Sequence, residues 1–171
     1  MIRPVTLAGA LALVAISGQV SAQQTAPVRA PELALALDAA QAALAACAAN
    51  NVKASASIVD AAGIQKVLLA ADGVRGPSVE VSIKKAYTAA TLKISTADLV
   101  ERIKTDKALE AKITADKSFW ARPGGFPFIV GADVIGAIGV AGAQNLNGVA
   151  GGERDAVCAK AGLDKVSARL K

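Results

Sequence analysis

Histidine is absent from the 171-residue chain, and the only methionine is Met1. Without an imidazole, the chain cannot build a histidine general base, a Ser-His-Asp triad or a histidine-ligated zinc site. Enzymes and metal centres that depend on those groups are therefore excluded.

Aromatic residues are also scarce, at 3% of the chain, whereas hydrophobic residues make up 53%. The core must therefore consist of alanine, valine, leucine and isoleucine. This composition, with 19% charged residues, is typical of a globular protein of one domain. The net charge of +5 becomes +4 without Arg3 (5 − 1), and no basic block is flanked by aromatics, so nucleic acid is not an expected partner.

The first 22 residues predict a signal peptide rather than part of the fold. MIRPVT carries one charge, LAGALALVAIS is an apolar run, and GQVSA ends in small residues, so cleavage is expected after Ala22. The apolar run is shorter than the roughly 20 residues of a membrane-spanning helix. We therefore expect a periplasmic or secreted protein with no membrane span after cleavage. An uncleaved N-terminal anchor is the alternative.

Cysteine occurs twice, as Cys47 and Cys158. In an exported protein, two distant cysteines most often form a disulfide. Closing a loop of about 110 residues would contribute on the order of 4–5 kcal/mol in the chain-entropy model. Two buried thiols are the alternative, and the lack of a C-x-x-C spacing argues against a redox role.

Apolar spacing divides the rest of the chain into a linker at 23–31 and one domain at 32–171. The domain should begin with a helix that ends at Asn50 and buries Leu33, Leu37, Ala40, Leu44 and Cys47. The later pattern predicts strands at 52–60 and 64–71, a helix from Pro77, a helix capped by Ser95 with Asp98, strands at 126–130 and 134–141, and a helix at 153–161 ended by Gly162. The two hairpins imply an antiparallel sheet, with the outer helices, the first and the last, over one of its faces. First and last helices packed side by side would bring Cys47 and Cys158 together.

Further expectations concern individual faces. Residues 52–60 alternate as a half-buried strand does. The helix after Pro77 should pair Glu80 with Lys84 on its surface. Its apolar face should consist of Val79, Ile83, Ala86 and Ala90.

The stretch ARPGGFPFIVGADVIGAIGVAGA, residues 121–143, predicts a glycine-rich hairpin. Its first strand has Phe126, Phe128 and Val130 on one face. The faces of its second strand differ: one has Val134, Gly136, Ile138 and Val140, and the other, mostly small, has Ile135, Ala137, Gly139 and Ala141. Glycine inside a strand often marks a place where another backbone or a ligand comes close.

Three motifs, in this order, resemble the GlcG/HbpS family of haem-binding proteins. They are SIVDAAG with ADGVRGPSVEVSIKKAYTAA, then PGGFPFIVGADVIGAIGVAGA, and finally GERDAVCAKAGLDKV. The resemblance covers residues 33–166. It implies an α/β (α+β) fold: a profilin-like sandwich with a central antiparallel sheet of about five strands flanked by helices. It also implies a homo-oligomer that binds haem or a similar flat apolar anion.

The chain departs from the family pattern in two places. Ala70 and Ala71 replace the usual Arg-Met before the Asp-Gly turn, and Ala141 replaces the serine of Gly-Val-Ser-Gly. An arginine suited to a haem propionate is therefore missing, and so is a hydroxyl. Histidine and methionine, the commonest neutral axial ligands of haem iron, are missing too once Met1 is removed.

Positions that match the family provide a candidate haem site. Tyr87 would ligate the iron through its phenolate, with Thr88 as a further oxygen. The alternative for Tyr87 is a helix residue packed on the sheet with its hydroxyl at the surface.

The other candidates would hold the ring and its carboxylates. Carboxylate partners would be Lys84, Lys85 and Arg122, which otherwise lie on a solvated surface. The walls of an apolar pocket would be Phe126, Phe128 and Trp120, which otherwise belong to the core or to a subunit contact.

These observations favour an exported, non-enzymatic haem-binding protein that acts as a carrier or sensor accessory. Two alternatives stay open. One is an oligomeric structural or interaction module that has lost haem binding. The other is a haem-degrading enzyme, against which the absence of histidine weighs. The sequence contains no recognisable catalytic constellation and no phosphate-binding loop.

Overall fold

The computed structural model describes residues 28–171. The predicted signal peptide at 1–22, and most of the linker predicted at 23–31, lie outside the described residues. Among residues 28–171, no helix is long and apolar enough to cross a membrane.

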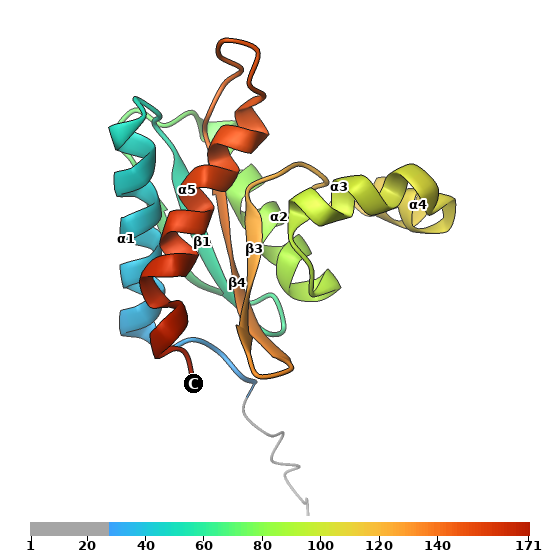
Figure 1. The fold of residues 1–171 in the computed structure, drawn as a ribbon, viewed down its shortest axis with the longest axis horizontal. Helices are drawn as coiled ribbons and strands as arrows, with labels where there is room; N and C mark the ends of the chain where they lie inside the picture. Colours follow the sequence, from blue (N-terminus) through green and yellow to red (C-terminus); the bar gives the residue numbers. More distant parts are fainter. Residues whose placement is uncertain (1–27) are drawn as a thin grey trace, which may run out of the picture.

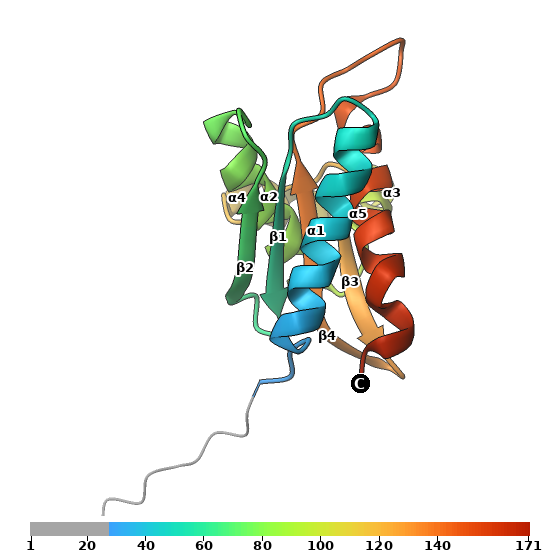
Figure 2. The same cartoon turned by 90° about the vertical axis from the view of Figure 1, so that its left-hand side faces the viewer.

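The described residues form a three-layer sandwich (Figures 1 and 2). Its elements are α1 (Leu33–Ala49), β1 (Ser55–Asp60), β2 (Gln65–Ala70), α2 (Gly76–Leu92), α3 (Thr96–Thr105), α4 (Lys107–Ala115), β3 (Gly125–Val130), β4 (Asp133–Ala141), α5 (Gly151–Val166) and a 3-10 turn (Ser167–Arg169). The antiparallel sheet has the order β2-β1-β4-β3. Helices α1 and α5 cover one face and α2 the other, while α3 and α4 project as an arm (Figure 1).

This architecture confirms the predicted α/β sandwich, with one correction: the sheet within residues 28–171 has four strands rather than about five. As predicted, the first and last helices cover one face of the sheet, and α2 covers the other face. As a result all six residues of β1 are buried, so the prediction of a half-buried strand was wrong.

Helix α1 turns mainly alanines toward the core. Its buried residues are Leu35, Ala36, Ala39, Ala40, Ala43 and Cys47. Leu33 and Leu37, predicted to be buried, are 58% and 36% exposed. Small side chains let α5 approach closely, because a Cβ at Gly162 would lie 2.5 Å from the carbonyl oxygen of Ala39.

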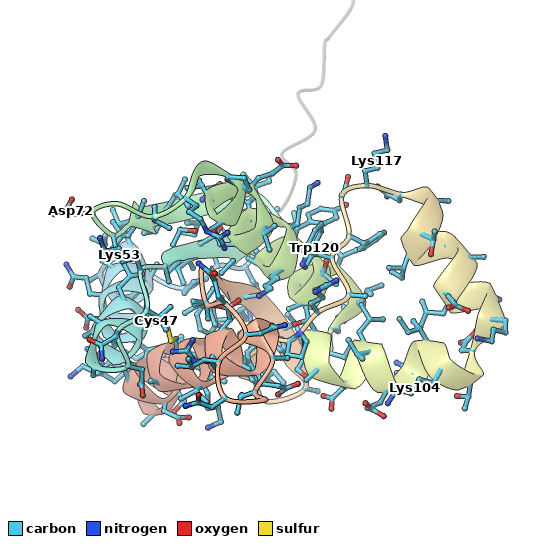
Figure 3. All side chains as sticks on the ribbon, turned by 90° about the horizontal axis from the view of Figure 1, so that it is seen from above. Cys47, Lys53, Asp72, Lys104, Lys117 and Trp120 are labelled. Atoms are coloured by element: carbon cyan, nitrogen blue, oxygen red, sulfur yellow. A yellow bond between two sulfur atoms is a disulfide. The ribbon has the colours of Figure 1, made fainter. Side chains whose placement is uncertain are left out.

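The same contact explains why α5 does not end at Gly162, as predicted, but continues to Val166. The glycine serves helix–helix packing there rather than helix termination. The predicted disulfide is confirmed: Cys47 of α1 and Cys158 of α5 are bonded, with their Cα atoms 5.2 Å apart (Figure 3).

Helix α2 buries a face that is largely polar. Its buried residues are Ser78, Ser82, Lys85, Ala86, Thr88, Ala89 and Ala90, whereas Val79 and Ile83 are only half-buried. The predicted apolar face was therefore only partly right. Every buried side-chain nitrogen or oxygen in the described residues has a hydrogen-bond partner, so the polar face is satisfied. The predicted pair of Glu80 and Lys84 is confirmed at 2.6 Å.

The glycine-rich hairpin is formed by β3 and β4. Phe128 lies in the core beneath α1 and α5, and Phe126 and Val130 pack against the same core, as their shared face predicted. The small face of β4 receives α2: a Cβ on Gly139 would lie 2.2 Å from the carbonyl oxygen of Ser82. The close neighbour is thus a helix backbone, not a ligand.

Ile135 departs from the predicted alternation and joins the core beneath α1 and α5. The pairing of β3 with β4 is irregular between Phe128 and Ile129, and such a bulge re-aims the neighbouring side chain.

The α3–α4 arm begins at the predicted cap. The Ser95 hydroxyl accepts a hydrogen bond from the backbone N–H of Asp98 at 3.0 Å. Leu99, Ile113 and Phe119 form a small cluster of their own inside the arm. The chain then returns to the sandwich through residues 116–124.

Candidate functional site

A cleft of about 480 Å³ opens where the first turns of α2 and α5 meet the segment returning from the α3–α4 arm. This volume is within the range of about 300–1,000 Å³ usual for small-molecule sites. Helix α2 lines it with Pro77, Ser78, Val81 and Lys85; α5 and the residue before it with Ala150, Gly151, Gly152 and Asp155; and the returning segment with Trp120, Ala121, Arg122 and Pro123.

One wall of the cleft is apolar. Trp120 stands there with Val81 of α2 and Val100 of α3. The backbone N–H of Trp120 donates to Thr88 Oγ1 at 2.9 Å, and that hydroxyl donates to the Lys84 carbonyl oxygen at 2.7 Å. Lys84 Nζ lies 5.8 Å from the centroid of the Trp120 ring, within cation–π distance. These contacts fix the indole beside α2, where Figure 3 labels it.

The rim of the cleft is cationic. Arg75, the N-cap of α2, and Arg122 are both exposed lining residues. Neither guanidinium forms an ion pair with a carboxylate of residues 28–171. A smaller hollow of about 270 Å³ shares Arg75 and adds Lys53 and Arg154. Guanidinium groups bind carboxylates through paired hydrogen bonds, so this rim suits an anion.

The floor of the cleft holds a buried ion pair. Lys85 Nζ donates to Asp155 Oδ2 at 2.7 Å and to the Val140 carbonyl oxygen at 2.9 Å. The side chains of Lys85 and Asp155 are only 2% and 6% exposed. Asp155 Oδ1 accepts a further hydrogen bond from the backbone N–H of Ala143 at 2.8 Å. The pair therefore connects α2, β4 and α5.

Burial decides the acid–base behaviour of this pair. It lowers the pKa of Lys85, although Asp155 opposes the change, and the nearby Arg122 charge lowers this pKa further. Burial likewise raises the pKa of Asp155, against the opposing effect of Lys85. Compared with the same side chains free in water, Lys85 therefore loses its proton more readily and Asp155 keeps its proton more readily, so both shifts favour the uncharged forms.

Gly124 makes room for the ammonium group. A Cβ at this position would lie 2.7 Å from Lys85 Nζ and 2.8 Å from the Val140 carbonyl oxygen. Its φ of +122° also lies in the region that disfavours other residues. The sequence placed Gly124 at the start of the glycine-rich hairpin but did not indicate that it lies against Lys85.

Of the predicted site residues, the cleft brings together Lys85, Arg122 and Trp120. Lys84 and Thr88 lie just behind it, in contact with Trp120. Lys85 does not lie on a solvated helix face but is buried against Asp155.

The other predicted residues lie elsewhere. Tyr87 packs against Phe119, with ring centroids 5.6 Å apart, and against Gly63, and it does not line the cleft. Phe126 and Phe128 belong to the core on the opposite face of the sheet. The structure therefore separates the proposed iron ligand and two proposed ring contacts from the cleft.

Sequence reasoning missed two residues of the cleft. Asp155 and Arg75 occur within the motifs GERDAVCAKAGLDKV and ADGVRGPSVEVSIKKAYTAA, but the sequence analysis gave neither of them a role. An isolated acid on a predicted buried face, three residues before Cys158, was the available signal for Asp155. No spacing in the sequence connects it with Lys85, 70 residues away.

Taken together, the fold and the cleft define an α/β sandwich protein with an apolar-walled, electropositive ligand site. Residues 32–164 match the family described as "Haem degrading protein HbpS-like", and the chain belongs to this family.

Solved structures agree with that assignment. A double mutant of HbpS from Streptomyces reticuli is 28% identical, with a TM-score of 0.72 over 91% of this chain and 97% of that one. Protein ORFY of Klebsiella pneumoniae is 26% identical, with a TM-score of 0.73 over 86% of this chain and 97% of that one. A PduOC:heme complex, at 21% identity and a TM-score of 0.71 over 83% of this chain and 97% of that one, shares the fold.

One curated relative matches at a similar level. An uncharacterised 15.0 kDa protein of Citrobacter freundii, from the dhaT-dhaS intergenic region, is 31% identical over 133 residues. The match covers 77% of this chain and 89% of the relative.

The residues of the cleft fit haem in part. Trp120, Val81 and Val100 provide an apolar surface for a flat ring, and Arg75 and Arg122 suit its two carboxylates. The iron would find neither histidine nor methionine. Residues 28–171 contain no group of three or more histidine, cysteine, aspartate or glutamate side chains that could hold a metal ion.

Proposed function

We propose that this protein binds haem, or a similar flat apolar anion, in the cleft beside Trp120. The observation that carries the proposal is the combination of the Trp120 wall with Arg75 and Arg122 on one rim. An apolar ring with acidic groups at its edge needs both features in this arrangement. Membership of the HbpS-like family supports haem as the ligand.

We further propose that the protein acts outside the cytoplasm as a homo-oligomeric carrier or sensor accessory, without catalysing a reaction. The predicted signal peptide at 1–22 supports export. The bond between Cys47 and Cys158 supports an oxidising compartment, since disulfides persist there.

Haemin titration of the mature protein tests the binding. We expect a saturable change of the Soret band near one equivalent. Trp120 is the only tryptophan of the chain, so the fluorescence comes from one residue of the cleft, and we expect haemin bound there to quench it with the same midpoint. A Soret change without quenching would place the haem elsewhere, and no saturable change would remove the proposal.

The two arginines provide the sharper arm of this test. Arg75→Ala with Arg122→Ala should raise the Kd for haemin on the order of a hundred-fold or more, because two charge-assisted hydrogen bonds are lost and each is worth about 1.5–3 kcal/mol. Arg102→Ala is the matched control, since Arg102 is an exposed arginine of the arm that does not line the cleft. Equal affinity of the double variant and the control would contradict the role of the rim.

A second candidate is an oligomeric interaction module that has lost haem binding. The placement of Tyr87 outside the cleft, together with the absence of histidine, favours it. Light scattering should then find an oligomer, and haemin should leave both the Soret band and the Trp120 fluorescence unchanged. Saturable quenching at one equivalent would exclude this candidate.

A further inference from the structure

The haem contacts proposed above, Trp120, Arg75 and Arg122, do not use the buried pair on the cleft floor. Lys85 and Asp155 both line the cleft, yet each is almost fully enclosed. We propose that Lys85 is a nucleophile that forms an imine with the carbonyl group of a small 2-oxo acid, with Asp155 as its proton partner. This inference goes beyond haem binding and does not depend on it.

The hydrogen bonds of Lys85 suit a neutral amine. A neutral amine has two N–H groups and one lone pair, whereas the ammonium ion has three N–H groups. Within the described residues, Nζ has two acceptors, Asp155 Oδ2 and the Val140 carbonyl oxygen. Two acceptors leave the third position on the nitrogen for the lone pair, which is the group that attacks a carbonyl carbon.

The surroundings support the same state. Burial has the largest effect on the pKa of Lys85 and lowers it, the Arg122 charge lowers it further, and the charge and hydrogen bond of Asp155 oppose the change without reversing it. Desolvation and a nearby cation are the two means by which proteins activate a lysine for Schiff-base chemistry. Lys84, one residue away, provides a contrast, because it is partly exposed and paired with Glu80.

Arg122 identifies the class of substrate. It lines the same cleft and is near enough for its charge to act on Lys85. A carboxylate held by this guanidinium would place an adjacent carbonyl carbon over the cleft floor. A compact molecule with neighbouring carboxylate and carbonyl groups, a 2-oxo acid, meets both requirements.

The reaction is balanced with no further reactant. The Nζ lone pair forms a bond to the carbonyl carbon, and the electron pair of the C=O double bond moves to oxygen. Asp155 Oδ2 takes one proton from the nitrogen and gives it to this oxygen, which becomes a hydroxyl group. Asp155 then takes the second proton from the nitrogen and gives it to the hydroxyl group, which leaves as water as the C=N double bond forms. Amine and ketone become imine and water, and Asp155 ends in its initial state.

The test is reductive trapping. The mature protein is incubated with pyruvate and sodium cyanoborohydride, and its intact mass is measured. We expect one addition per chain, equal to the mass of pyruvic acid less one oxygen atom, and peptide mapping should place it on Lys85. A label spread over the exposed lysines, or absent from Lys85, would overturn the proposal and leave the pair as a structural connection.

Three variants complete the experiment. Lys85→Arg should abolish the specific label, while Lys84→Arg should keep it. Arg122→Ala should raise the pyruvate concentration for half-labelling on the order of ten-fold. If Lys85→Arg does not fold, peptide mapping of the labelled protein without substitutions still shows whether the label is on Lys85. The result is independent of the haemin titration, because it is a covalent mass change that needs no haem.

Discussion

Gly139 illustrates, at the scale of one residue, how the small face of the hairpin is used. Its missing side chain lets the backbone of α2 lie directly on β4, and a Cβ would approach the Ala86 nitrogen to 2.4 Å. Backbone atoms on both sides cannot move away as a flexible side chain can. The face that sequence alone left open to a ligand is therefore occupied by the protein itself.

Gly139→Ala should thus destabilise the fold by about 3 kcal/mol, at the upper end of the usual cost of overpacking. Urea unfolding measures the change. Gly76→Ala is the control, because a Cβ at Gly76 meets nothing within 4 Å, and its stability should match that of the unchanged protein. Equal stability of both variants would mean that α2 does not pack on β4 in this way.

Thr88 acts through another residue. Its hydroxyl accepts from the Trp120 backbone N–H, so it positions the indole rather than touching a ligand. Thr88→Val keeps the shape but removes this acceptor. We expect a several-fold higher Kd for haemin and a shifted Trp120 emission maximum, whereas Thr91→Val on the exposed side of α2 should change neither. An unchanged emission spectrum of Thr88→Val would contradict the positioning role.

At the scale of elements, α1 and α5 form the layer that closes the sheet. Their contact consists of alanines and Gly162 and is bonded covalently by Cys47 and Cys158. Burying apolar surface stabilises a fold by about 25 cal/mol for each Å². Small residues bury little of it, so they contribute little free energy to this contact. The disulfide is consequently an important share of what holds this layer together.

Replacing both cysteines with alanine should lower the free energy of unfolding by on the order of 4–5 kcal/mol, the chain-entropy value for such a long loop. The measurement is urea unfolding of the double variant beside the unreduced parent. Thiol labelling of the denatured, unreduced parent should find no free cysteine. Two labelled thiols, or equal stability with and without the cysteines, would refute the bond.

The existence of helices and strands was predictable, but the faces they bury were less so. The periodicity located α1, the two hairpins and the Ser95 cap, because local spacing and turn residues determine them. It chose Leu33 and Leu37 as buried positions, which the structure exposes. Hydropathy ranks leucine above alanine, whereas close helix packing against α5 prefers the smaller residue.

On the scale of the whole molecule, the cleft is an assembly of distant segments. Its floor pairs Lys85 of α2 with Asp155 of α5, and its wall comes from Trp120 after the α3–α4 arm. The pair also connects the layers, since Lys85 of α2 donates hydrogen bonds both to the Val140 carbonyl oxygen on β4 and to Asp155 on α5. The Lys85–Asp155 pair therefore contributes both to the stability of the fold and to the lining of the cleft.

Asp155→Ala should reduce the free energy of unfolding by about 2–6 kcal/mol, because the buried Lys85 amino group and the Ala143 backbone N–H would each lose a hydrogen-bond partner, at about 1–3 kcal/mol apiece. Urea unfolding at neutral pH gives the value. Glu80→Ala breaks the exposed pair with Lys84 and should leave the unfolding midpoint unchanged, since solvent screens that contact. Similar losses in both variants would show that burial does not distinguish the two pairs.

The sequence by itself determined most of the order of elements and, through three motifs, the family, and it made a bond between Cys47 and Cys158 the expected state of the two cysteines. These depend on local periodicity, on turn chemistry and on residue identity, all of which can be read along the chain. Only the tertiary structure decided that Tyr87 lies outside the cleft, that Lys85 is paired with Asp155, and that Arg75 faces the same cleft as Arg122. The physical reason is that such contacts join residues far apart in the sequence, and they depend on the rotation of each helix against the sheet. That rotation is decided by how closely small residues such as Gly139 and Gly162 let the backbones approach.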